Sequence, residues 1–198
     1  MSPAATRTFI QRTQAVALAL ALTASHAGHA ALATEAHAGD SGPTTATRHV
    51  HGFADGQGMC DSDSVKEAVS LVYQADDLPA AANIAQRCDA MASALGRPFY
   101  KIIASRVHAL IAMRVRDMAA LKNAGESLVA EAQVPEYVAD GHMFIAFACV
   151  FGGNPKCARE HVEQARTMFT ELKVTDALAQ LQPLEQALVQ LEEQGGGR

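Results

Sequence analysis

Apolar and polar residues alternate along most of this chain with the period of an α-helix. In the segment 176–193 leucines recur every three or four positions, and Met118, Leu121, Leu128 and Ala132 follow a similar stripe. A stripe of this period gives a helix one face to bury and one face to expose. The pattern predicts seven helices, at residues 64–75, 79–95, 98–115, 118–132, 135–151, 155–173 and 176–193.

Prolines and capping residues mark the limits of these helices. Pro79, Pro98, Pro135 and Pro155 each precede a helix-forming run. A proline in the first turn of a helix loses no needed donor and presets φ, so these residues predict helix starts. The expected N-terminal caps are Asp117, Asn154 and Thr175, and the expected C-terminal cap is Gly96.

Polar residues recur in the predicted turns at a regular spacing. Asp77, Asp117 and Asn154 each lie between the two helices of a pair, 40 and 37 residues apart. Short links make successive helices antiparallel, and a period of this length with two helices per unit is typical of an α-solenoid. We therefore expect an all-α fold of three stacked helical hairpins, closed by the atypical seventh helix as a cap.

These features resemble the tetratricopeptide-repeat family, in its long-period variants rather than its strict form of about 34 residues. The resemblance covers residues 61–194 and implies a right-handed solenoid. It is carried by the three turn residues and by small residues at packing positions, namely Ala81, Cys88, Ala158 and Ala165. The second unit departs from the pattern with Leu121 and Leu128, and the characteristic aromatic is matched only loosely by Tyr73 and Phe147.

The resemblance also implies a binding surface, because the first helix of each pair lines the concave face in that family. Lys66 and Arg106 lie eleven residues before Asp77 and Asp117, and Arg114 lies two turns further along. Family members use basic residues at such positions to hold peptide carboxylates. In the third unit Met143 takes this position and Phe147 continues the stripe. The expected ligand is an acidic and apolar peptide. The alternative is that these residues are ordinary surface cations and apolar residues at the rim of the core, without a binding role.

Residues 1–27 have the order of regions that is typical of a secretory signal peptide. Arg7 and Arg12 precede the apolar run 15–22, and small residues follow, so we expect cleavage near Ala27 or Ala30. The next segment, 28–60, is rich in His, Gly and Ala and is expected to be a flexible lead, with a short disordered tail at 195–198. The mature protein is then periplasmic or secreted.

Composition narrows the possible partners. The chain has 198 residues, 49% of them apolar and only 5% aromatic, which suits one helical domain. Removing residues 1–27 leaves 14 basic against 21 acidic residues, a net charge of −7. Such a protein has little electrostatic reason to bind nucleic acid or anionic lipid, and the apolar run 15–22 is too short to span a bilayer.

The four cysteines are expected to form disulfides, because export places them in an oxidising compartment. Cys149 and Cys157 lie four residues on either side of Gly153, which puts them level on facing helices. Cys88 lies about 16 Å along its helix from the turn at Asp77, near the point where Cys60 enters the domain. The predicted pairs are Cys60 with Cys88 and Cys149 with Cys157. Zinc and redox interpretations lack the required ligand spacing.

The remaining motifs point away from catalysis. No nucleophile elbow, zinc protease motif, P-loop or dinucleotide fingerprint is present, so we expect a protein that is not an enzyme and needs no cofactor. His49 and His51 form an H-x-H pair that is a candidate for copper or zinc. The favoured hypothesis is a non-catalytic module that binds a protein or peptide of the cell envelope. The alternatives are a metal-binding or metal-delivery protein and an accessory subunit of an envelope complex.

Overall fold

The computed structural model describes residues 60–195, and this part of the chain is all-helical, without a β-strand. The predicted all-α class is therefore confirmed, and the predicted helices match the observed ones closely. The signal peptide, most of the lead, His49 and His51 lie outside the described residues. The observed helices are α2 (Ser62–Ser70) with the π-helical turn η2 (Leu71–Ala75), α3 (Leu78–Leu95), α4 (Pro98–Val115), α5 (Met118–Glu131), α6 (Pro135–Phe151), α7 (Pro155–Glu171) and α8 (Thr175–Gly195).

The three turn residues cap the second helix of each pair, whereas Thr175, which was also expected to be a cap, is the first residue of α8. The side-chain oxygens of Asp77, Asp117 and Asn154 accept hydrogen bonds from backbone N–H groups in the first turns of α3, α5 and α7, at 3.0, 2.9 and 3.1 Å. Each bond satisfies a donor that has no partner within the helix. Gly96 ends α3 in the left-handed conformation, as predicted.

The turns inside the hairpins repeat one backbone geometry. Arg116 and Gly153 have φ values of 60° and 71°, and each is followed by the capping residue of the next helix. The N–H groups of Asp117 and Asn154 donate to carbonyl oxygens five residues earlier, both at 2.9 Å. This bond pattern is that of a Schellman motif. The first turn is a variant, because Asp77 bonds six residues back, to the carbonyl of Leu71, across the π-helical turn.

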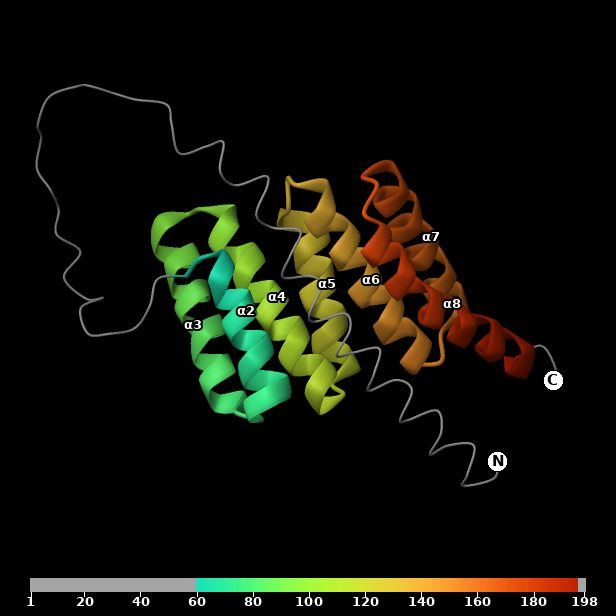
Figure 1. Cartoon of the computed structure of the whole chain (residues 1–198), viewed down its shortest axis with the longest axis horizontal. Helices are drawn as coiled ribbons and strands as arrows, with labels where there is room; N and C mark the ends of the chain where they lie inside the picture. Colours follow the sequence, from blue (N-terminus) through green and yellow to red (C-terminus); the bar gives the residue numbers. More distant parts are fainter. Residues whose placement is uncertain (1–59, 196–198) are drawn as a thin grey trace, which may run out of the picture.

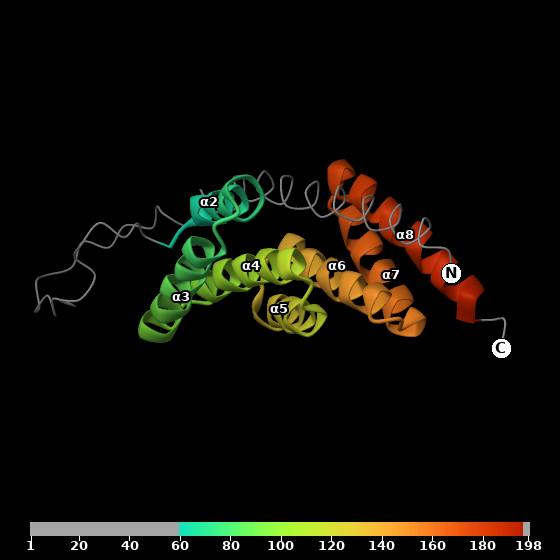
Figure 2. The same ribbon diagram turned by 90° about the horizontal axis from the view of Figure 1, so that it is seen from below.

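The helices form a row in which each packs against the next one along the chain, and α2 also packs against α4, so that α3 is the outermost helix at that end (Figure 1). Seen from below, α2, α4 and α6 lie on one side of the row, whereas α3 and α5 lie on the other, and the row is curved (Figure 2). The structure thus has two layers of helices. Its core consists of Ala, Val, Leu and Ile side chains between the layers, with Phe169 as one of its largest fully buried residues.

Two glycines allow α5 and α6 to approach closely. A Cβ atom placed on Gly125 would lie 2.7 Å from the carbonyl oxygen of Gly141, and one on Gly141 would lie 2.8 Å from the carbonyl oxygen of Gly125. Both distances are shorter than van der Waals contact. The α5–α6 interface therefore requires glycine at these two positions.

The cysteines pair as the sequence predicts. The structure joins Cys60 to Cys88, with Cα atoms 5.2 Å apart, and Cys149 to Cys157, with Cα atoms 5.8 Å apart. The first pair ties the start of α2 to α3, and the second spans the turn between α6 and α7. Within residues 60–195 no helix has the length and apolar character needed to cross a membrane.

Candidate functional site

Arg106, predicted to contact a peptide, is instead a core residue. It is only 4% exposed, and its guanidinium lies 3.3 Å from the carboxylate of Asp140 and 5.1 Å from the ring centre of Tyr137. Burial raises the pKa of Asp140 to about 6, although the charge of Arg106 acts in the opposite direction. Arg106 thus joins α4 to α6 inside the protein, where a ligand does not reach it. Its position on the apolar stripe explains this burial.

The apolar part of the predicted row is also buried. Met143 and Phe147 are 2% and 6% exposed, and Phe147 stacks on Phe151 with ring centres 4.7 Å apart. Met143 and Phe147 therefore belong to the core and do not line an open groove. The alternative reading of core apolar residues holds for Met143 and Phe147.

The two remaining cations of the predicted row lie at the surface, and each has an acidic neighbour. Lys66 contacts Asp63 at 2.9 Å on the same helix, whereas Arg114 contacts Asp76, the left-handed residue that ends η2, at 2.6 Å. The Arg114–Asp76 pair links α4 to the first hairpin turn. The predicted row of five residues is therefore split between the surface and the core.

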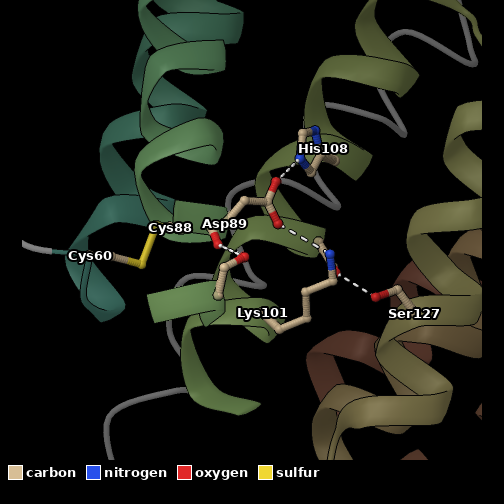
Figure 3. Close-up of polar contacts among 8 residues, drawn as sticks. Cys60, Cys88, Asp89, Lys101, His108 and Ser127 are labelled. Carbon is tan, nitrogen blue, oxygen red and sulfur yellow. Dashed lines mark hydrogen bonds and ion pairs between the residues drawn. A yellow bond between two sulfur atoms is a disulfide. The ribbon is translucent and has the colours of Figure 1, made fainter. Parts of the chain in front are cut away.

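The structure reveals a polar cluster that the sequence analysis did not identify. Asp89 of α3 contacts Lys101 Nζ at 3.2 Å and His108 Nε2 at 2.8 Å, both on α4 (Figure 3). Burial alone would raise the pKa of Asp89, but hydrogen bonds and positive charge from His108 and Lys101 outweigh it and lower the pKa. Cys88, which is disulfide-bonded to Cys60, precedes Asp89 and holds this part of α3 in place.

A groove of about 370 Å³ adjoins this cluster between α4 and α5. Lys101 and His108 line it on α4, Asn123 and Ser127 line it on α5, and Val115, which is 52% exposed, lies at its α4 end near the turn. The volume falls at the lower end of the range of ligand pockets in proteins.

The hydroxyl groups in this groove are not arranged as an activated nucleophile. Ser105 Oγ and Ser127 Oγ are hydrogen-bonded to each other at 2.9 Å, whereas the His108 Nε2 atom is directed at Asp89. A nucleophilic serine requires a base within hydrogen-bond reach. The groove instead offers hydroxyl, amide, ammonium and imidazole groups beside apolar surface, a combination suited to holding a polar chain.

A second pair of histidines lies across the α6–α7 interface. The Nδ1 atoms of His142 and His161 are 2.9 Å apart, with both side chains partly buried. No cluster of three or more His, Cys, Asp or Glu side chains with metal-binding geometry occurs in residues 60–195. The sequence gives no sign of this pair, because the 19 residues between the two histidines conceal that the α6–α7 hairpin brings them level.

Comparison with models of protein families, with curated proteins and with solved structures finds no match to this chain.

Proposed function

We propose that this chain is an exported, non-catalytic module of stacked helical hairpins, related in design to tetratricopeptide repeats, that binds an extended peptide segment of an envelope protein. The repeated hairpin turns at 76–77, 116–117 and 153–154 support the repeat architecture, since stacked units with one turn geometry are typical of solenoids. The signal-like sequence at 1–27 and the two cysteine pairs support export.

The observation that carries the binding proposal is the groove between α4 and α5. Asn123 supplies a donor and an acceptor that suit a peptide backbone, and Val115 offers exposed apolar surface for a side chain. Lys101 places a positive charge beside the groove and His108 adds an imidazole, so an acidic side chain or carboxylate of the peptide competes with Asp89 for them. This site replaces the expected row, in which Arg106, Met143 and Phe147 are buried.

Site-specific photocrosslinking in envelope extracts tests this function. A crosslinker at Asn123 in the groove is compared with one at Gln164, an exposed amide residue on α7. We expect a discrete adduct from position 123 and none from position 164. Ala120→Glu, which places a charge at the lining of the groove, should abolish the adduct while the protein stays folded. Equal labelling from both positions, or an adduct that survives Ala120→Glu, refutes the groove as the binding site.

A further inference from the structure

The histidine pair between α6 and α7 brings two potential metal ligands together. His142 Nδ1 and His161 Nδ1 lie 2.9 Å apart, and their ring centres are 5.1 Å apart with a tilt of 31° between the planes. At this distance one Nδ1 carries a hydrogen and the other accepts it through its lone pair. The two nitrogen atoms are therefore held next to each other by side chains from different helices.

The separation of the two nitrogens suits a tetragonal ion. Metal–imidazole bonds of about 2.0–2.1 Å at a right angle place the two nitrogens about 2.9 Å apart, whereas a tetrahedral angle requires about 3.3–3.4 Å. The observed 2.9 Å corresponds to adjacent positions of a square-planar or tetragonal site. Turning the two rings toward a shared point brings both lone pairs onto the ion, and the bridging hydrogen moves to Nε2 of its own ring by tautomerisation.

Acidic side chains surround this pair with a negative net charge. Glu160 of α7 acts electrostatically on both histidines, and Glu126 of α5 acts on His161. Lys122, the opposing cation at His161, forms an ion pair with Glu126 at 3.2 Å. Two carboxylates against one ammonium attract a divalent cation.

We propose that His142 and His161 bind one divalent transition-metal ion, with Cu²⁺ preferred over Zn²⁺. Imidazole nitrogen favours these metals over Mg²⁺, and the order of stability for divalent ions places Cu²⁺ first. Water or a neighbouring carboxylate completes the coordination, because the described residues supply only two imidazoles at this point. This site is separate from the α4–α5 groove and does not depend on the proposed peptide binding. It is also distinct from His49 and His51, which are 91 or more residues earlier in the sequence.

Copper titration of the full chain tests the proposal with three matched variants. His142→Gln and His161→Gln each remove one ligand and keep a polar side chain, whereas His108→Gln removes a histidine that is bonded to Asp89 in another part of the fold. Every variant has the same number of histidines, so ions bound elsewhere are counted equally. We expect His142→Gln and His161→Gln to bind one equivalent of Cu²⁺ less than the wild type and His108→Gln.

Thermal melting supplies the second readout. An ion that joins α6 to α7 stabilises the folded state, so Cu²⁺ should raise the Tm of the wild type and of His108→Gln but not of the other two variants. Mg²⁺ should leave all four Tm values unchanged. Equal stoichiometry and an equal Tm response in the four proteins would overturn the proposal.

Paramagnetic broadening tests the site in the unaltered chain, in case a substitution disturbs the fold. Cu²⁺ below one equivalent should broaden the ring signals of His142 and His161 before those of His108. Broadening of His108 at the same Cu²⁺ concentration refutes a specific site at the α6–α7 interface.

Discussion

The ion pair of Arg106 and Asp140 offers a direct test of whether these two charges are buried in the core. Arg106→Met removes the cation but fills most of its volume, and it leaves the carboxylate of Asp140 buried without a counter-charge. Removing one partner of a buried ion pair costs about 3–5 kcal/mol. The matched control is Arg114→Met, because Arg114 is 40% and Asp76 is 68% exposed. An exposed pair contributes about 0.2–1 kcal/mol.

The pH dependence of this loss follows from the carboxyl group. The pKa of Asp140 is about 6 in the folded protein, above its ordinary value of 3.8, so its protonated form is favoured by the fold. The stability that this group contributes is complete below pH 3.8 and is lost as the pH rises through 6. Arg106 lowers this pKa, so its removal raises it further. The penalty of Arg106→Met is therefore largest at neutral pH and shrinks in acid.

Urea unfolding followed by far-UV circular dichroism measures both quantities. We expect Arg106→Met to lose about 3–5 kcal/mol near pH 8 and about half of that or less near pH 4.5. The double variant Arg106→Met, Asp140→Leu should regain most of the loss, since no buried charge remains. If Arg106→Met lowers the free energy of unfolding by less than about 1 kcal/mol, as Arg114→Met does, and by the same amount at every pH, Arg106 behaves as an exposed residue and the reasoning is wrong.

Three further substitutions test the backbone geometry and the cysteine pairs. Gly141→Ala places a Cβ 2.8 Å from the carbonyl oxygen of Gly125, so we expect a loss of at least about 1–3 kcal/mol in urea unfolding, and an unchanged midpoint would exclude the close contact. Arg116→Gly relieves an exposed left-handed residue with φ of 60°, and a gain of about 0.5–1 kcal/mol is expected; a lower Tm would contradict the turn geometry. Replacing Cys149 and Cys157 together by serine should lower the free energy of unfolding by about 2.5 kcal/mol, because the disulfide restricts the unfolded chain. Alkylation of all thiols of the wild type under non-reducing conditions would contradict the presence of this disulfide.

Local signals in the sequence were sufficient for the helices and their ends. A proline in the first turn and an Asp or Asn cap affect only the backbone within a few residues of themselves. Pro98, Asp117 and Asn154 therefore mark helix starts independently of the tertiary structure. The pairing of Cys149 with Cys157 was accessible for the same reason, since equal distance from one turn fixes the two positions. The all-α class follows from these local rules.

Contacts between distant segments were not accessible in this way. Arg106 lies on an apolar stripe, and only the position of Asp140, on another helix, shows that its charge is matched inside the core. Gly125 and Gly141 carry no periodic signal that reveals their contact. The cluster around Asp89 was missed for the same reason, because its partners Lys101 and His108 lie 12 and 19 residues away on the next helix.

The positions of the two disulfides affect the shape of the groove between α4 and α5. The cysteine pairs lie in the hairpins α2–α3 and α6–α7, whereas α4–α5, packed between them, contains no cysteine. Because Asp89 follows Cys88 directly, the bond to Cys60 also fixes the carboxylate that holds Lys101 and His108 beside the groove (Figure 3). Reduction of this disulfide should therefore loosen the groove as well as the first hairpin, so the proposed peptide binding is expected to weaken under reducing conditions.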